Sequence, residues 1–249
     1  MLAGCDFTSS LHKNILKAQE YISSQEFEKA VELYQTILKA KPTDAIELKI
    51  HYQLGEIYSI YLNKYELAIE HYSAVLDLTY EPLWQVRTLE KIGNIYFENL
   101  KNWHEASKAY NKLINFEPVL EDQDFYRFRY AKCLMEANEY KKAKSNFEQI
   151  ISLSNGEYAV RSYFELGMMD FYEKEWDDAV NNWFEYIKRE TRKDRIVQTK
   201  FLIANAYESS EKLKEAYNIY YSIIGEYPNP DVIKARLESL YNRRLARKR

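Results

Sequence analysis

Residues 54–72 read LGEIYSIYLNKYELAIEHY and residues 92–110 read IGNIYFENLKNWHEASKAY, so the two stretches share one order of small, aromatic and alanine positions. In both, a glycine (Gly55, Gly93) precedes an alanine (Ala68, Ala106) by thirteen residues. A pattern that returns at a period of about 20 to 50 residues is typical of stacked repeats. The sequence therefore predicts helix pairs that pack on their neighbours instead of one globular core.

The alanine recurs six times, at intervals of 36 to 38 residues. A small residue stands twelve or thirteen positions before each alanine, and an aromatic residue stands four positions after it. The small residues are Ala18, Gly55, Gly93, Ala131, Gly167 and Ala204; the alanines are Ala30, Ala68, Ala106, Ala143, Ala179 and Ala216; the aromatics are Tyr34, Tyr72, Tyr110, Phe147, Trp183 and Tyr220. Neither helix of a pair could bury its apolar stripe alone, so the two small residues allow close approach and the ring fills the gap beside them.

This pattern resembles the tetratricopeptide repeat from about Leu11 to about Pro228. The family's first-helix signature stands here as Leu54-Gly55 with Tyr58, Ile92-Gly93 with Tyr96, and Ile203-Ala204 with Tyr207, and its closing proline as Pro42, Pro118 and Pro228. Repeats two, four and five lack that proline, and Asp170 takes the tyrosine position of the fifth repeat. Repeats two and three carry one extra residue between the small residue and the alanine.

The resemblance implies an all-α, right-handed superhelical solenoid of about six helix-turn-helix repeats in one continuous domain. The predicted repeats are about 11–44, 48–82, 86–120, 124–157, 160–193 and 197–230, after a short N-terminal segment at 1–10. Residues 231–249 are predicted to form a C-terminal capping helix with a basic tail, with Ile233, Leu237, Leu240 and Tyr241 at helical spacing.

The composition agrees with an all-helical chain. Hydrophobic residues make up 46% of the 249 residues, with 23 Tyr but only 6 Gly and 5 Pro. The mean hydropathy is nevertheless −0.57, as expected of amphipathic helices. No stretch of residues 6–249 is long and apolar enough to span a bilayer.

The N-terminus, Leu2-Ala3-Gly4-Cys5, resembles a bacterial lipobox, in which a signal peptidase cuts before the cysteine and the thiol is acylated. The charged start and apolar run of a secretory signal do not precede it. The start codon lies too late, the chain has been trimmed to the lipobox, or the match is chance. Acyl chains on Cys5 would hold the protein at a membrane, since each buried CH₂ contributes about 0.8 kcal/mol. Asp6 resembles an inner-membrane retention signal of enterobacterial lipoproteins, but lineages differ, so the membrane stays open.

Catalytic and metal-binding patterns are missing from the sequence. The four histidines, His12, His51, His71 and His104, are expected to lie in different repeats, so that no two pair as metal ligands. There is no phosphate-binding glycine loop and no nucleophile elbow. Cys133 is expected to be a buried reduced thiol. We predict that the protein is not an enzyme and holds no metal or cofactor.

The resemblance implies that the first helices line a concave groove. Its central zone would hold Arg87, Lys91, Asn94, Arg129 and Lys132, and its C-terminal zone Phe128, Phe164, Met168, Phe171 and Phe201, with Met135 and Phe97 at the border. Such a groove would accept a peptide with an acidic segment and apolar anchors. For each aromatic, packing between successive first helices is the alternative. The basic cluster resembles the family's carboxylate clamp, although its positions depart from the usual ones.

The last nine residues carry five positive charges and no acidic side chain. These charges are Arg243, Arg244, Arg247, Lys248 and Arg249. A solvated helix end, which the helix dipole favours, is one interpretation, and contact with an anionic lipid or an acidic partner is the other. The net charge of −3 argues against nucleic acid as the partner.

The two ends together predict a non-enzymatic interaction scaffold, anchored by lipid at Cys5 in the periplasm of a Gram-negative bacterium and serving an envelope assembly. Families with this layout include the lipoprotein of the outer-membrane β-barrel assembly machinery, pilotins of type IV pili, and gliding or cell-division lipoproteins. The alternative is a cytosolic adaptor or regulator that binds a peptide in its groove, with the lipobox match due to chance. The partner and the oligomeric state stay open.

Overall fold

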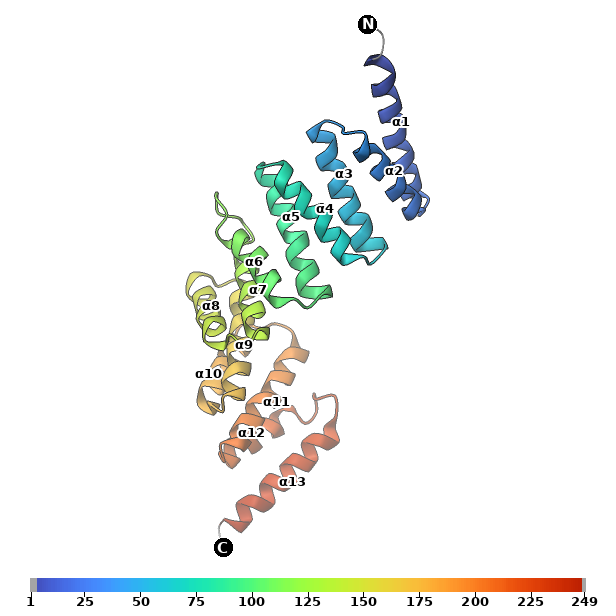
Figure 1. Cartoon of the computed structure of the whole chain (residues 1–249). Helices are drawn as coiled ribbons and strands as arrows, with labels where there is room; N and C mark the ends of the chain where they lie inside the picture. The colour runs from blue at the N-terminus through green and yellow to red at the C-terminus, as the bar shows by residue number, and fades with distance from the viewer. Residues whose placement is uncertain (1–3, 248–249) are drawn as a thin grey trace. The chain divides into compact units, whose positions relative to one another are not determined.

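The protein is described by a computed structural model that covers the backbone of residues 4–247 and the side chains of residues 10–247. Its helices follow one another as antiparallel pairs joined by short turns (Figure 1). Contacts divide the chain into two compact units, of which the first ends at Glu121 and the second begins at Asp122. The sequence predicted one continuous array, whereas the contacts separate these two units, and each is described by itself.

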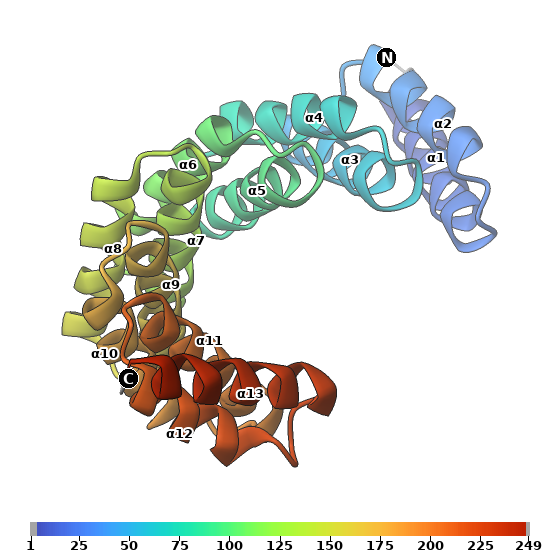
Figure 2. The same cartoon turned by 90° about the horizontal axis from the view of Figure 1, so that it is seen from below.

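The first unit contains three helix pairs. Its elements are α1 (Gly4–Ser23), α2 (Phe27–Lys39), α3 (Asp44–Glu56), η1 (Ile57–Tyr61), α4 (Tyr65–Leu78), α5 (Pro82–Asn94), η2 (Ile95–Asn99) and α6 (Trp103–Ile114). Within this unit α3 and α5 lie in one layer and α4 and α6 in the other (Figure 2). Helix α1 begins at Gly4, seven residues before the predicted start of the first repeat.

The second unit contains three further pairs and a last helix. Its elements are α7 (Gln123–Glu136), α8 (Tyr140–Leu153), α9 (Glu157–Tyr172), α10 (Trp176–Ile187), α11 (Lys193–Ser209), α12 (Leu213–Ile223) and α13 (Pro230–Ala246). Helices α7 and α9 lie in one layer, and α8 and α10 lie in the other (Figure 2). The predicted six repeats and capping helix are thus confirmed over residues 4–247.

Several first helices begin earlier than predicted. Helices α3, α5 and α11 start four residues before the expected repeat starts. Pro82 occupies the first turn of α5, where its missing N–H costs nothing, and Asp44 and Asp194 place negative charge in the first turns of α3 and α11. These local signals extend each helix N-terminally beyond the repeat pattern.

Close approach within each pair explains the small residues. A methyl group added at Gly55 would lie 2.6 Å from the Tyr72 ring, and one added at Gly167 would lie 2.4 Å from Nε1 of Trp183. Both rings are fully buried, and the six recurring alanines are also at 0% exposure. The aromatic residue therefore fills the space beside the small residue, as the sequence predicted.

Gly167→Ala is expected to destabilise the second unit by about 2 kcal/mol, because the new methyl must displace a buried indole. Gly225→Ala is the matched control, since nothing lies within 4 Å of a methyl group there. Urea unfolding followed by far-UV circular dichroism measures both variants. Equal stability of the two would contradict the close approach of α9 and α10.

The extra residue of repeats two and three forms a π-helical turn at the end of each first helix. In η1 the Leu62 N–H donates to Ile57 O at 3.1 Å, and in η2 the Leu100 N–H donates to Ile95 O at 3.0 Å. These bonds span five residues instead of four, which accommodates one added residue without moving the second helix. The departure from the family spacing therefore leaves the pairing intact.

Asp170 is fully buried where the family has tyrosine. Its Oδ1 accepts a hydrogen bond from Lys144 Nζ on α8 at 2.7 Å, and its Oδ2 accepts one from Asn182 Nδ2 on α10 at 2.7 Å. The Asp170 carboxylate raises the pKa of the Lys144 ammonium, mainly through this hydrogen bond. A charged network thus connects α8, α9 and α10 in place of an aromatic contact.

Helix α13 covers the end of the second unit. Its residues Ile233, Leu237 and Leu240 are buried as predicted, in one cluster with Val197 of α11 and Tyr220 of α12, whereas Tyr241 is 55% exposed. Within residues 4–247, no helix combines the length and the apolar character that a membrane crossing needs.

Candidate functional site

One face of α9 carries the side chains that form the candidate site. Arg161, Phe164 and Met168 are spaced by three and four residues, so they lie on one face of the helix. Tyr172 continues this face and is 74% exposed. Two pockets of the second unit open along this face, one near each end of α9.

The methionine pocket lies between α7 and α9 and has a volume of about 680 Å³. Met135, Phe164, Met168, Met169 and Tyr172 supply its apolar surface. Met169 is buried, while Met135, Phe164 and Met168 are half-buried. Methionine is flexible and polarizable, so it adapts to apolar ligands of different shape. The pocket therefore suits an apolar side chain of a partner.

The charges around the methionine pocket differ from the prediction. Lys132, predicted as a basic groove residue, donates from Nζ to Glu165 Oε2 at 3.1 Å. Glu136 and Glu173 also line the pocket. Acidic groups therefore outnumber basic ones there, and Lys132 is already paired.

The other predicted residues of the second unit do not line this pocket. Phe128 is 8% exposed and packs against Phe147 and Tyr158, at ring centroid distances of 5.6 and 5.5 Å. Phe201 stacks on Tyr227 at 4.7 Å. The Phe128–Tyr158 contact joins the successive first helices α7 and α9, as the packing alternative expects, whereas Tyr227 lies in the segment after α12.

Arg129 and Phe171, two further residues predicted to line the groove, contact aromatic rings of the second unit. Arg129 lies over the Phe125 ring at 5.3 Å, and Phe171 contacts Trp176 at 5.0 Å. A binding role for either residue stays a prediction.

The remaining candidates lie in the first unit. Lys91 Nζ donates to Glu56 Oε1 at 3.2 Å, and Asn94 Oδ1 accepts from the Tyr110 hydroxyl at 2.7 Å. Phe97 packs edge-on against Trp103, and Arg87 is exposed. The predicted central zone is therefore shared between two units, and its first-unit members mostly serve contacts within their own unit.

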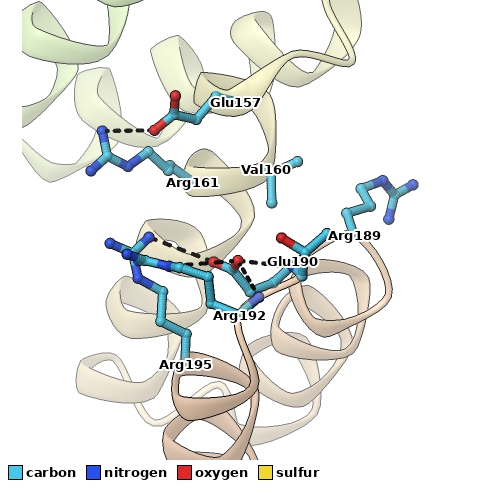
Figure 3. Close-up of a pocket in the computed structure, with 8 residues that line it drawn as sticks. Glu157, Val160, Arg161, Arg189, Glu190, Arg192 and Arg195 are labelled. Atoms are coloured by element: carbon cyan, nitrogen blue, oxygen red, sulfur yellow. Dashed lines mark hydrogen bonds and ion pairs between the residues drawn. The ribbon is translucent and has the colours of Figure 1, made fainter.

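The arginine pocket lies at the N-terminal end of α9 and has a volume of about 340 Å³ (Figure 3). Arg161 of α9, Arg195 of α11, and Arg189 and Arg192 of the intervening loop line it. The Arg161, Arg192 and Arg195 side chains extend to the same side of the pocket, while Arg189 turns to the other side (Figure 3). Arg189 bonds to Glu185 and lies over the Tyr163 ring at 4.9 Å.

Glu190 organises the arginine pocket. Its carboxylate accepts from the Tyr186 hydroxyl at 2.6 Å and from the backbone N–H groups of Thr191 and Arg192 at 2.9 and 3.0 Å. Burial and this carboxylate raise the pKa of Tyr186. The groove positions did not predict this pocket, because Arg189 and Arg192 lie in the loop between α10 and α11, although the Arg-rich run 189–195 is visible in the sequence.

The described part of the basic tail is occupied by contacts within the second unit. Arg243 donates to Glu208 Oε1 at 2.9 Å and to Glu211 Oε1 at 2.7 Å, and Arg247 also pairs with Glu211. Arg244 lies over the Tyr217 ring at 5.9 Å. Lys248 and Arg249 lie outside the described residues. These pairs make the tail part of the capping helix.

The structure corrects one histidine prediction. His51 of α3 and His71 of α4 belong to the same repeat, and their Nδ1 atoms are 2.8 Å apart. Residues about twenty positions apart can face each other across the two helices of one pair, so the prediction that the four histidines lie in different repeats was wrong for these two. Burial, and then the neighbouring His51, lower the pKa of His71 to about 4. Among the described residues, no group of three or more potential ligands could hold a metal ion.

The side chain of Cys133 lies within the described residues, whereas that of Cys5 does not. Cys133 is a fully buried free thiol, as predicted, and burial raises its pKa to about 12. Cys5, the predicted lipidation site, lies outside the residues whose side chains are described. Its acylation stays a prediction.

Repeated helix pairs with small residues at their crossing points define the protein as a helical repeat protein. Sequence models of the tetratricopeptide repeat match residues 14–44 and 48–81, and residues 87–118 and 126–153, about half of the chain. The chain belongs to the tetratricopeptide repeat family. No curated protein matches it in sequence.

Solved structures with similar folds include a type IV pilus biogenesis factor, a Pseudomonas aeruginosa protein and a protein with a peptide-binding site. PilW, a type IV pilus biogenesis factor, is 16% identical, with a TM-score of 0.54 over 93% of this chain and 98% of that chain. PilF of Pseudomonas aeruginosa is 15% identical, with a TM-score of 0.54 over 95% and 98%. YrrB, a tetratricopeptide repeat protein with an unusual peptide-binding site, is 17% identical, with a TM-score of 0.56 over 78% and 97%. Such identities show a shared fold.

Proposed function

We propose that the protein is a non-enzymatic scaffold that binds a peptide segment of a partner protein along the α7–α9 face of its second unit. The methionine pocket is the observation that carries this proposal, since half-buried Met135, Phe164 and Met168 face a volume of about 680 Å³. Apolar pockets with a few polar groups at the edge are the usual form of a binding site. Tyrosine is a frequent contributor of binding energy, and Tyr172 lies at the edge of the pocket.

Tyr172→Ala is expected to weaken peptide binding about tenfold, because truncation removes an exposed aromatic contact at the pocket edge. Peptides are first selected from a random library on the full chain, and fluorescence anisotropy then gives the affinity of a labelled selected peptide. Tyr221→Ala is the matched control, since Tyr221 is similarly exposed on α12 and lines neither pocket. Equal loss in both variants, or failure to select any peptide, would contradict the proposal.

The scaffold is proposed to be anchored by lipid at Cys5 in the periplasm of a Gram-negative bacterium, where it serves an envelope assembly such as a barrel-assembly, pilus, motility or division machine. The support is the Leu2-Ala3-Gly4-Cys5 sequence. The similar fold of PilW, a type IV pilus biogenesis factor, is compatible with this assignment. Acyl chains at Cys5 would hold the chain at a bilayer without a transmembrane helix.

Mass spectrometry of the protein expressed from its native locus is expected to show an acylated N-terminal Cys5 in the membrane fraction. Cys5→Ser is expected to abolish acylation and release the chain, whereas Cys133→Ala, which changes the other cysteine, leaves both unchanged. An unmodified chain beginning at Met1 in the soluble fraction would instead support the cytosolic adaptor.

A further inference from the structure

The arginine pocket holds more positive charge than its own acidic groups neutralise. Arg161, Arg192 and Arg195 have side chains that are 39, 49 and 36% exposed. The nearly buried Glu190 lies 3.9 Å from Arg192 and 3.5 Å from Arg195, and it already accepts three shorter hydrogen bonds. Glu157 is 3.6 Å from Arg161 but 70% exposed, so this pair contributes little. The guanidinium groups are therefore available to an external anion.

Packing restricts the Arg161 guanidinium, and a hydrogen bond holds the Arg192 backbone, before any ligand arrives. Arg161 lies over the rings of Phe128 and Tyr158, at 5.7 and 5.8 Å. The loop that carries Arg192 is fixed because Glu190 accepts from its backbone N–H. Guanidinium groups with restricted motion lose less entropy when they bind a carboxylate, and their planar donors match its two oxygens.

We propose that the arginine pocket binds an aspartate or glutamate side chain of the same peptide whose apolar residue enters the methionine pocket. This inference rests on the proposed function and specifies the chemistry of the partner. The two pockets lie along one face of α9, because Arg161 and Met168 are separated by two helical turns.

The separation of the pockets sets the spacing in the peptide. Seven residues of α9 rise by about 10 Å. An extended peptide advances about 3.3 Å per residue, so an acidic residue and an apolar residue about three positions apart would reach both pockets. The acidic groups around the methionine pocket, Glu136 and Glu173, disfavour a second acid at the apolar end. The expected peptide therefore has one acidic residue about three positions from its apolar anchor and no acidic residue next to that anchor.

The shape of the arginine pocket favours a peptide over a bilayer surface. The pocket is recessed between α9 and α11, and the exposed Glu157 carboxylate stands at its edge (Figure 3). A flat anionic membrane would meet that carboxylate, whereas a single carboxylate side chain can enter between the guanidinium groups.

A double-mutant cycle on the full chain tests the inference. The probes are a peptide selected on the wild-type chain and its analogue with the acidic residue replaced by the amide. Arg161→Gln is expected to lower the affinity for the acidic peptide about tenfold, because one charge-assisted contact is lost. The affinity for the amide analogue is expected to stay within about twofold of the wild-type value. Arg236→Gln is the matched control, because this arginine of α13 is 48% exposed and lines neither pocket. Added salt is expected to weaken only the acidic peptide.

The possible outcomes separate this inference from the proposed function. Selected peptides without an acid, or equal binding of both analogues to wild type and Arg161→Gln, would overturn the inference and leave peptide binding standing. Failure to select any peptide would overturn both. Arg161-dependent binding to phosphatidylglycerol vesicles without discrimination between the peptides would assign the arginines to the membrane and overturn the inference.

Discussion

Lys144→Met is expected to destabilise the second unit by about 3 kcal/mol, because it leaves the fully buried Asp170 carboxylate without its cation. The partial exposure of Lys144 places the effect at the lower end of values for broken buried pairs. Urea unfolding followed by tryptophan fluorescence reports the change, since Trp176 and Trp183 lie on α10 beside this network. The raised pKa of Lys144 implies that the stabilisation is present at neutral pH and is lost as the pH rises above about 10.5.

Two further variants distinguish a broken buried pair from a general effect of removing lysine. Lys142→Met, on the same helix, removes an exposed ion pair with Glu139 and is expected to leave the unfolding midpoint unchanged. Adding Asp170→Leu to Lys144→Met is expected to recover most of the lost stability, because no buried charge remains. A double variant no more stable than Lys144→Met would contradict this account of Asp170.

Stability of the first unit is expected to fall by about 2 kcal/mol as the pH is lowered from about 6.5 to about 4, because the unfolded chain binds a proton that folded His71 resists. The unfolded histidine titrates near 6.5, whereas burial and His51 lower the folded pKa to about 4. Because the folded pKa of His71 is lower than the unfolded one, the free energy of unfolding is highest above about pH 6.5. It falls as the pH is lowered towards about 4.

His71→Gln is expected to flatten this pH dependence, while the exposed His104→Gln leaves it unchanged. Thermal unfolding from pH 4 to 8 provides the comparison, and the difference between variants removes the background from carboxylates such as Glu47 and Glu70. Identical pH profiles for wild type and His71→Gln would show that the histidine pair does not titrate in this range.

Much of the fold follows from features that repeat in the sequence. The fixed interval between a small residue, an alanine and an aromatic residue predicts the helix pairing and explains it. At Gly167, for example, an added methyl group would lie 2.4 Å from Trp183 Nε1. The extra residue in repeats two and three was also visible, but its form as a π-helical turn depends on which backbone bonds close around it. The division into two units has no comparable signal in composition.

The candidate site was predictable only in part. Met135, Phe164, Met168 and Lys132 were placed in the groove from the family pattern, and all four line the methionine pocket. The pattern does not report which neighbours neutralise a charge, so the pair between Lys132 and Glu165 could not be foreseen. Pairs across two helices, such as His51 with His71, need the relative rotation of those helices, which a one-dimensional pattern does not contain.

Methionine methyl NMR tests the central claim most directly. The chain has four methionines, and Met135, Met168 and Met169 line the methionine pocket, while Met1 lies outside the described residues. Titration of ¹³C-methyl-methionine protein with a selected peptide is predicted to shift the signals of Met135, Met168 and Met169 in proportion to occupancy. Saturable binding of the peptide with these three signals unmoved would contradict the assignment of the α7–α9 face as the binding site.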